Sequence, residues 1–240
     1  MGDFGATLAA ASILLGAAPR GDGHSVLVLP GFLAEDSSTA ALRTYLRSRR
    51  YDVHGWGLGR NLGPTERALG GMASQLSDLY ERSGRPVSIV GWSLGGIFAR
   101  ELARQQPDMV RQVITLGSPF QLADPRHSRA NPAYERLSNL HVNAASLPRR
   151  RDLGRPIPVP ATAIYSRFDG IVRWQACLEV PGPRRENVAV FSSHLGLGLN
   201  PAALWVVADR LAQAEGEWRP FRAPSIARRL FFPAPAARAA

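Results

Sequence analysis

The sequence predicts one α/β domain, with a mostly parallel sheet and helices on both faces. Short apolar runs alternate along the chain with segments that have helical periodicity, and this alternation is typical of such a sheet. The 240 residues suit a single domain with a sizeable core. Apolar residues make up 45% of the chain, as in globular proteins. The sequence shows no internal repeat.

Six short apolar runs have the length and composition of buried parallel strands. They span residues 26–29, 51–56, 87–91, 113–116, 162–165 and 188–191. Glycines at 55, 57 and 59 end the second run, and Pro86 precedes the third. We therefore expect a minimal sheet of six strands.

Helical spacing follows four of these runs. The expected helices begin at Ser37 or Ser38, at Pro64 and Thr65, at Leu94, and at Pro201. A serine or threonine at such a start can cap the helix, and proline suits its first turn. Apolar residues then recur on one face, most clearly at Met72, Leu76 and Leu79.

Residues 120–158 break the alternation. The segment is rich in Pro, Asn, Ser and Arg, with one short helix expected around residues 134–140. A stretch this long without a strand is usually functional or disordered. It follows the fourth strand, so we expect a small cap over a site. Its scattered apolar residues would then line a substrate groove, and they are Leu122, Tyr134, Leu137, Leu140 and Val142.

The N-terminal residues 1–24 include an apolar run, residues 6–18. The only early charge is Asp3, whereas a secretory signal begins with positive charge. The run is also too short to cross a bilayer as a helix. We therefore expect a helical extension packed on the domain of a cytoplasmic protein, with a peripheral membrane contact as the alternative.

The C-terminal residues 222–240 are rich in Pro, Ala and Arg. This composition predicts a loosely attached tail, in which Leu230, Phe231 and Phe232 have the apolar character needed to dock.

The formal net charge of +10 invites comparison with nucleic-acid-binding proteins. All 29 basic residues, however, are arginine. Lysine also binds phosphate well, so a phosphate-binding surface has no reason to exclude it. Biased codon usage explains the composition more simply, and we expect no nucleic-acid partner. The single cysteine, Cys177, excludes an internal disulfide and lacks a catalytic signature.

The strongest chemical signal is Gly91-Trp92-Ser93-Leu94-Gly95-Gly96, between the third strand and its helix. A serine hydroxyl is a poor nucleophile unless it is presented to a base and an acyl carbon together. A sharp strand-to-helix turn presents it in this way and requires small neighbours. Ser93 is therefore the predicted nucleophile.

Two backbone N–H groups are candidates for an oxyanion hole. The N–H of Leu94 lies at a helix start, where it faces developing negative charge. The second donor should come from the loop after the first strand, and the N–H of Phe32 in Pro30-Gly31-Phe32 has that position.

The acid and base should follow later strands, because the carboxyl ends of parallel strands share one edge. Asp169 follows the fifth strand and His194 the sixth. The other four histidines precede or lie within strands, or lie in the 120–158 segment. The order Ser93, Asp169, His194 predicts a catalytic triad, with Glu179 and Asp124 as other acids to test.

Rival chemistries lack their motifs. There is no paired-cysteine metal site, no zinc helix, no complete dinucleotide fingerprint and no phosphate loop, which would need a lysine.

Five motifs together resemble bacterial α/β-hydrolases of the esterase and lipase type, between about Ser25 and Phe221. They are Leu29-Pro30-Gly31-Phe32, the segment around Ser93, Leu116-Gly117-Ser118-Pro119, residues 165–172, and Ser193-His194-Leu195-Gly196-Leu197. A further segment, Gly57-Leu58-Gly59-Arg60-Asn61, is similar to the same group but suggests no chemical role. In such lipases a histidine often precedes the oxyanion-loop glycine, where this chain has Pro30.

The resemblance implies a serine esterase or lipase that forms an acyl-enzyme on a small-molecule ester or lipid, with no cofactor and no metal. Trp92, Leu137 and Leu140 are the expected substrate-binding residues. An acyltransferase, a thioesterase or a perhydrolase would share the triad, and a non-catalytic binding protein could share the fold.

Overall fold

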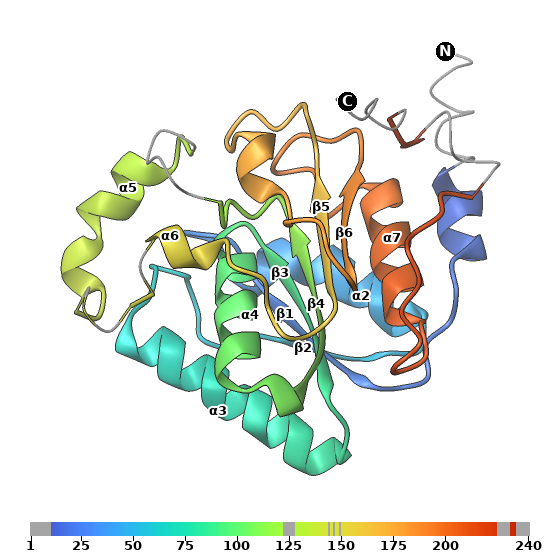
Figure 1. Cartoon of the computed structure of the whole chain (residues 1–240), viewed down its shortest axis with the longest axis horizontal. Coiled ribbons are helices and arrows are strands. Elements are labelled where there is room, and N and C mark those ends of the chain that lie inside the picture. Colours follow the sequence, from blue (N-terminus) through green and yellow to red (C-terminus); the bar gives the residue numbers. More distant parts are fainter. Residues whose placement is uncertain are drawn as a thin grey trace.

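Six parallel strands form one sheet, with the order β2-β1-β3-β4-β5-β6 in the described part of the chain (Figure 1). The computed structural model describes residues 11–121, 128–143, 145, 147–148, 150–224 and 231–233. The strands are β1 (Ser25–Leu29), β2 (Asp52–Gly55), β3 (Val87–Trp92), β4 (Val110–Leu116), β5 (Ala161–Tyr165) and β6 (Arg185–Ala189). The predicted α/β class and the six strands are confirmed.

Two strand boundaries differ from the expected ones. β4 begins at Val110, three residues before the predicted run, and β6 covers 185–189 instead of 188–191. β6 lies at the edge of the sheet, where Arg185 and Glu186 pair through their backbone with Ala161 and Thr162. Hydropathy cannot mark such a start, because backbone pairing at an edge does not require apolar side chains.

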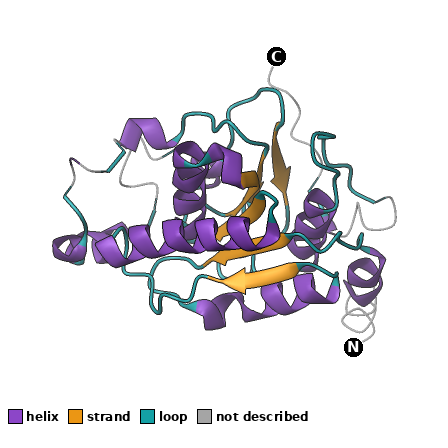
Figure 2. Cartoon of the chain, turned by 90° about the horizontal axis from the view of Figure 1, so that it is seen from below, coloured by secondary structure: helices purple, strands orange, loops and turns teal. Residues whose placement is uncertain are grey.

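Helices cover both faces of the sheet (Figure 2). On one face α3 (Glu66–Ser83) and α4 (Leu94–Gln105) enclose a core that includes Met72, Leu76 and Phe98. On the other, α2 (Ala40–Ser48) and α7 (Pro201–Leu211) enclose a second core with Leu42 and Val207. Both cores consist of the apolar faces that the helical spacing predicts.

Two helices begin with a side-chain cap. The Thr65 side chain accepts a hydrogen bond from the N–H of Ala68, and the Asn200 side chain accepts one from the N–H of Ala203. Neither Ser37 nor Ser38 caps α2. Its start is instead continuous with a short 3₁₀ helix, Asp36–Thr39.

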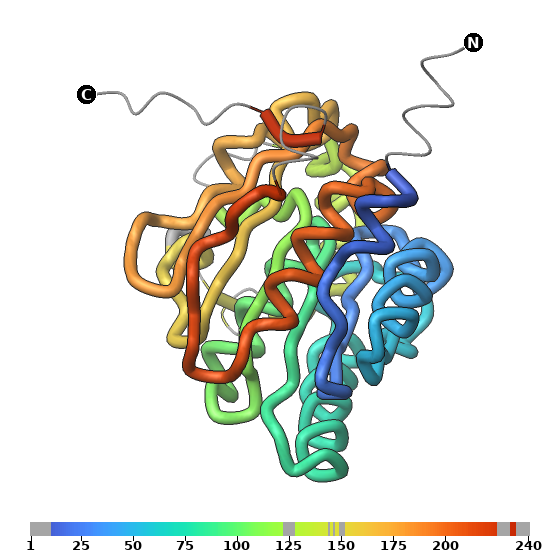
Figure 3. The backbone as a smooth tube through the Cα atoms, turned by 90° about the vertical axis from the view of Figure 1, so that its right-hand side faces the viewer, coloured from blue at the N-terminus to red at the C-terminus, as the bar shows by residue number. Residues whose placement is uncertain are grey.

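The described part of the N-terminal extension packs on the domain. Residues 11–17 are helical, and Leu14 and Ala18 are buried in the core beside α2 and α7 (Figure 3). The Tyr45 hydroxyl donates a hydrogen bond to the Leu15 carbonyl. Residues 1–10 lie outside the described residues.

The C-terminal tail is more closely attached than its composition predicts. Phe232 is buried in the same core, and its ring lies 5.4 Å from that of Phe221. The N–H of Phe221 in turn donates to Glu186 on β6. Aromatic burial outweighs the loose composition of the surrounding residues. Leu230 lies outside the described residues.

The described parts of the 120–158 segment lie near the N-terminal end of α4, which is at the carboxyl edge of the sheet, and near the start of α3. It contains α5 (Asn131–Arg136), a 3₁₀ turn (Ser138–Leu140) and α6 (Arg150–Leu153). The helix expected at 134–140 is thus shifted towards the N-terminus, because Pro132 suits the first turn of α5. Leu122, Asp124 and His127 lie outside the described residues.

No helix in the described ranges is long and apolar enough to cross a membrane.

Candidate active site

Ser93 occupies a strained turn between β3 and α4. Its φ of 53° and ψ of −118° lie in a region that residues with a side chain rarely adopt. The turn is tight: a Cβ added at Gly91 would lie 2.4 Å from the Gly95 carbonyl oxygen, and one added at Gly95 would lie 2.4 Å from the Leu29 carbonyl oxygen. The two glycines are therefore required sterically, and Ser93 is held half-buried at the carboxyl edge of the sheet.

Asp169 and His194 meet at the same edge, from the loops after β5 and β6. His194 Nδ1 lies 2.5 Å from Asp169 Oδ2, although 25 residues separate them. The side chains of His194 and Asp169 are only 6% and 1% exposed, respectively. The other carboxylate oxygen of Asp169 accepts hydrogen bonds from the N–H groups of Ile171 and Val172. Both carboxylate oxygens of Asp169 are thus held by contacts, one of them with the His194 imidazole.

Two further side chains, those of Ser166 and Trp92, hold the loops of Asp169 and His194 in place by hydrogen bonds. The buried Ser166 hydroxyl accepts hydrogen bonds from the N–H of Phe168, in the Asp169 loop, and from the N–H of Ser192, in the His194 loop. Trp92 Nε1 donates to the His194 carbonyl over 3.2 Å. Neither role followed from the motifs, because both depend on contacts between loops that are distant in sequence.

Gly117, directly after β4, leaves space for the side chains of Asp169 and His194. With a φ of 56°, it is in the left-handed region that favours glycine. A Cβ at this position would lie 3.2 Å from His194 Nδ1 and 3.3 Å from Asp169 Oδ2. The glycine of the Leu116-Gly117-Ser118-Pro119 motif thus allows the Asp169–His194 pair to approach β4.

The loop after β1 lies directly against Ser93. A Cβ added at Gly31 would be 3.3 Å from Ser93 Cβ. No hydrogen bond within the described part of the chain uses the N–H of Phe32. Leu94 begins α4, where N–H groups have no partner within the helix. The two backbone groups predicted as oxyanion donors therefore flank Ser93.

Asn61 holds this loop, and sequence reasoning assigned it no role. The residue is fully buried, and its Nδ2 donates to the Pro30 carbonyl over 2.9 Å. Its backbone pairs with the loop twice: the N–H of Leu33 donates to the Asn61 carbonyl, and the N–H of Asn61 donates to the Ala34 carbonyl. The similarity of residues 57–61 to known hydrolases was the signal that pointed to this position.

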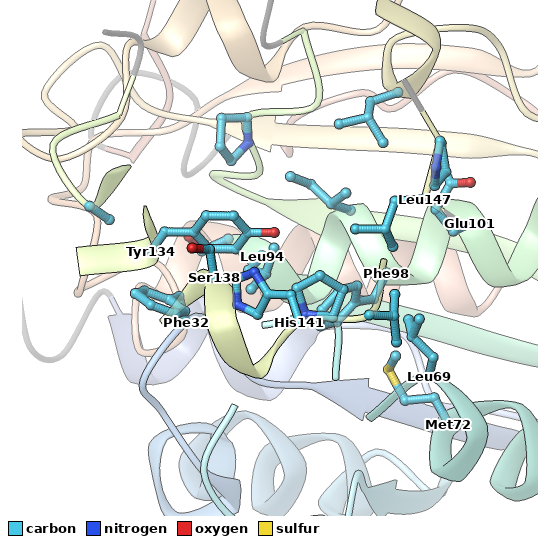
Figure 4. A pocket seen from close by; sticks show the side chains of 18 of the residues that line it. Phe32, Leu69, Met72, Leu94, Phe98, Glu101, Tyr134, Ser138, His141 and Leu147 are labelled. Carbon is cyan, nitrogen blue, oxygen red and sulfur yellow. The ribbon is translucent and has the colours of Figure 1, made fainter. Parts of the chain in front are cut away.

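A cavity of about 670 Å³ opens at Ser93. Figure 4 shows that Phe32 and Tyr134 lie at one end, and Leu69, Met72 and Glu101 towards the other. The cavity is walled by α3, α4 and the 120–158 segment. Its size is in the range of small-molecule sites.

Glu101 is the acidic residue of this cavity, and Tyr134 makes aromatic contacts at its other end. Burial raises the pKa of Glu101, although the Arg104 guanidinium pairs with its carboxylate. The Tyr134 ring contacts the rings of both Phe32 and His141, at 5.4 Å and 4.6 Å. His141 Nε2 lies 2.9 Å from the Leu62 carbonyl oxygen, which connects the 120–158 segment to the loop before α3.

The three expected substrate-binding residues are not among those that line the cavity. Trp92 is buried on the opposite face of the sheet, in the core with α7. Leu137 is half-buried and Leu140 is 45% exposed, because α5 ends earlier than predicted. From the same segment, Tyr134 and Val142 do line the cavity, as expected, and Leu147 and Leu153 join them.

The other candidate residues have other partners. Glu179 is buried and ion-paired with Arg100 of α4. Cys177 is buried, which raises the pKa of its thiol and makes a reactive thiolate unfavourable. Asp124 lies outside the described residues. In the described ranges, no group of three or more His, Cys, Asp or Glu residues is arranged to hold a metal ion.

A second Asp–His–Ser arrangement lies at the opposite, amino edge of the sheet. His24 Nδ1 is 2.5 Å from Asp22 Oδ1, and His24 Nε2 is 2.9 Å from Ser88 Oγ. Ser88 is fully buried within β3, so no substrate can reach its hydroxyl. We interpret this network as structural.

Comparison with solved structures shows which fold this arrangement belongs to. Lipase B from Aspergillus fumigatus superposes with a TM-score of 0.62 over 85% of this chain, at 17% identity. The alpha/beta hydrolase domain-containing protein 10 from mouse gives 0.53 over 79%, at 14% identity, with 88% of its own length covered. The chain has the α/β-hydrolase fold.

A structure described as that of metagenome-derived lipolytic enzymes, LipS and LipT, matches this chain with a TM-score of 0.56. The match covers 75% of this chain and 88% of that one, at 16% identity. The chain spans 57% of the length of the Aspergillus lipase. No protein-family model matches the sequence, and no sequence relative was found among curated proteins.

Proposed function

We propose that this α/β-hydrolase cleaves carboxylic esters, with Ser93 as nucleophile, His194 as base and Asp169 as the acid that orients the base. The observation that carries the proposal is the 2.5 Å contact between His194 Nδ1 and Asp169 Oδ2, at the same sheet edge as the strained Ser93. Structural neighbours described as a lipase and as lipolytic enzymes support it.

The proposed reaction proceeds through an acyl-enzyme. His194 Nε2 takes the hydroxyl proton of Ser93 as its oxygen bonds to the ester carbonyl carbon. The N–H groups of Phe32 and Leu94 stabilise the oxyanion that forms. The C–O bond to the alcohol breaks as His194 returns the proton to the leaving oxygen. Water, activated by the same imidazole, then releases the acid.

The 120–158 segment is proposed as a cap that excludes water and sets substrate preference. Tyr134 and Val142 of this segment form part of the wall beside Ser93.

Active-site labelling tests the proposal directly. A fluorophosphonate probe should label the wild-type protein at Ser93, and hydrolysis of 4-nitrophenyl acetate should stop in step with labelling. Ser93→Ala should abolish both, while Ser192→Ala, a change of a half-buried serine near the same site, should leave labelling intact. Labelling that persists in Ser93→Ala would refute the assignment.

Product analysis separates hydrolysis from acyl transfer. We expect the free acid to dominate when an alcohol is added at millimolar concentration. A dominant new ester would instead identify an acyltransferase that uses the same three residues, and turnover restricted to thioesters would identify a thioesterase.

A further inference from the structure

The cavity at Ser93 follows one face of a single helix. Six residues of α4 line it, at the spacing that one face of an α-helix produces. They are Leu94, Ile97, Phe98, Glu101, Leu102 and Gln105. Since Ser93 immediately precedes α4, the cavity begins at the nucleophile and continues along the helix as a groove.

The length of this groove follows from helix geometry. An α-helix rises about 1.5 Å per residue, so the lining from Leu94 to Gln105 extends for about 16 Å. An extended alkyl chain, with C–C bonds of about 1.5 Å, advances about 1.3 Å per carbon, and about 12 carbons therefore span the groove.

The walls opposite α4 are mostly apolar, with polar residues at Ser128, Asn131, Ser138, His141 and Asn143. Leu69 and Met72 of α3 form one wall, and Leu147 and Leu153 of the 120–158 segment form another. Among the described lining residues there is no arginine, although the chain has 29. Glu101 carries the only carboxylate of that lining, and it is paired with Arg104. The groove therefore suits an uncharged chain and offers no counter-ion to an anionic group.

The far end of the groove reaches solvent, because Gln105 is exposed. Carbons beyond this point would lie in water and gain little from burial. Affinity should therefore increase with chain length until the chain fills the groove, and additional carbons should not increase it further.

We propose that this groove holds a linear, uncharged acyl chain of about 12 carbons along α4, with its carbonyl at Ser93. The proposal rests on the proposed ester hydrolysis and names its substrate class: esters of medium- to long-chain fatty acids rather than short or branched acids.

A series of 4-nitrophenyl esters from acetyl to hexadecanoyl tests the proposal. We expect kcat/KM to rise with each added carbon, by at most about fourfold, the equivalent of about 0.8 kcal/mol per methylene. The rise should end near 12 carbons. A profile that peaks at acetyl or butanoyl would overturn the proposal, and so would a dependence on alcohol length alone, measured with alkyl acetates.

Two substitutions from different walls should shorten the groove. Leu69→Trp, at a half-buried position, and Leu147→Trp should each reduce the preference for dodecanoyl over butanoyl ester at least tenfold. Arg67→Trp is the matched control, since Arg67 is exposed on the same helix as Leu69 but does not line the groove. Identical profiles in all four proteins would overturn the groove.

Binding to the Ser93→Ala variant separates this inference from the proposed function. 1-Dodecanol should bind, as measured by calorimetry, at least tenfold more tightly than 1-hexanol, and addition of Leu69→Trp should remove the difference. If no ester is hydrolysed but dodecanol binds in this way, the proposed function fails and the groove stands. If esters are hydrolysed and dodecanol shows no preference over hexanol, the groove fails alone.

Discussion

Asn61 Nδ2 donates a hydrogen bond to the Pro30 carbonyl over 2.9 Å, and so connects a fully buried residue to the loop beside Ser93. The Asn61 Oδ1 atom is also occupied, because it accepts from the N–H of Gly63. Leu33, in the same loop, has a φ of 61°. A loop with such a conformation needs surrounding contacts to hold it, and Asn61 supplies three of them.

Asn61→Asp should therefore lower kcat by about 10- to 100-fold with little change in KM, since a misplacement of about 1 Å can cost about 100-fold. The carboxylate removes the donor to Pro30 without changing the shape of the side chain. Affinity for a trifluoromethyl ketone that mimics the tetrahedral intermediate should fall in parallel with kcat, as measured by inhibition.

Asn187→Asp is the control for this substitution. Like the Asn61 side chain, the Asn187 side chain makes two hydrogen bonds with the backbone: its amide donates to the Glu179 carbonyl and accepts from the Glu179 N–H. This contact lies away from Ser93. Asn187→Asp should leave kcat and the inhibitor affinity unchanged. Equal effects of the two substitutions on kcat would mean that Asn61 acts only through stability.

Asp169→Asn should stay folded and lose activity by about 10³- to 10⁴-fold. The side-chain oxygen can still accept from the N–H groups of Ile171 and Val172. The amide nitrogen would then face His194 Nδ1 as a donor and favour the imidazole tautomer that cannot accept the Ser93 proton. Steady-state kinetics and thermal unfolding measure the two effects, with Asp108→Asn, a change of an exposed acid, as control. Turnover close to wild type would exclude Asp169 as the orienting acid.

Stability should fall as the pH decreases through the range of His24. Burial is the largest influence on its pKa and lowers it below the usual 6.5, against the hydrogen bond that His24 donates to Asp22, and Arg111 and Arg85 lower it further. The unfolded chain therefore binds this proton at a higher pH than the folded chain does. The folded state keeps its full stability above about pH 7 and loses it progressively below about pH 6.5.

Urea unfolding between pH 5 and pH 8 checks this dependence. His24→Gln should be less stable than wild type at pH 8 and should show a smaller loss between pH 7 and pH 5. Asp22 does not contribute in this window: although burial opposes it, hydrogen bonds from His24 and Arg85 lower its pKa, so its stabilising effect is lost only as the pH falls below about 4. An equal loss in both proteins would assign the dependence to other groups.

Tyr134→Ala should widen the cavity beside Ser93, because this ring contacts Phe32 and lines the wall. We expect relative kcat/KM for esters of branched or aromatic acids to rise several-fold over acetyl ester. Leu140→Ser is the matched control from the same segment, since Leu140 is exposed and outside the lining. A larger change in Leu140→Ser than in Tyr134→Ala would restore the original expectation that the leucines of this segment set specificity.

The sequence by itself determined the elements whose signals are local. The apolar runs identified all six strands, and the glycines around Ser93 identified the turn, because steric limits on that turn act between residues close in the chain. The positions of Asp169 and His194 followed from strand order alone, since parallel strands bring their carboxyl ends to one edge.

Only the tertiary structure decided which side chains face the cavity. Trp92 is the last residue of β3 and directly precedes Ser93, yet the alternation of side chains along the strand places it in the opposite core. Leu137 and Leu140 lie after α5, where the sequence pattern is weak. The position of this part of the segment is set by hydrogen bonds from His141 to Leu62 and from Val142 to Pro64. Asn61 likewise acquires its place through partners about 30 residues earlier. Such contacts between distant segments leave no periodic signal, because they depend on how the loops meet and not on the order of residues within them.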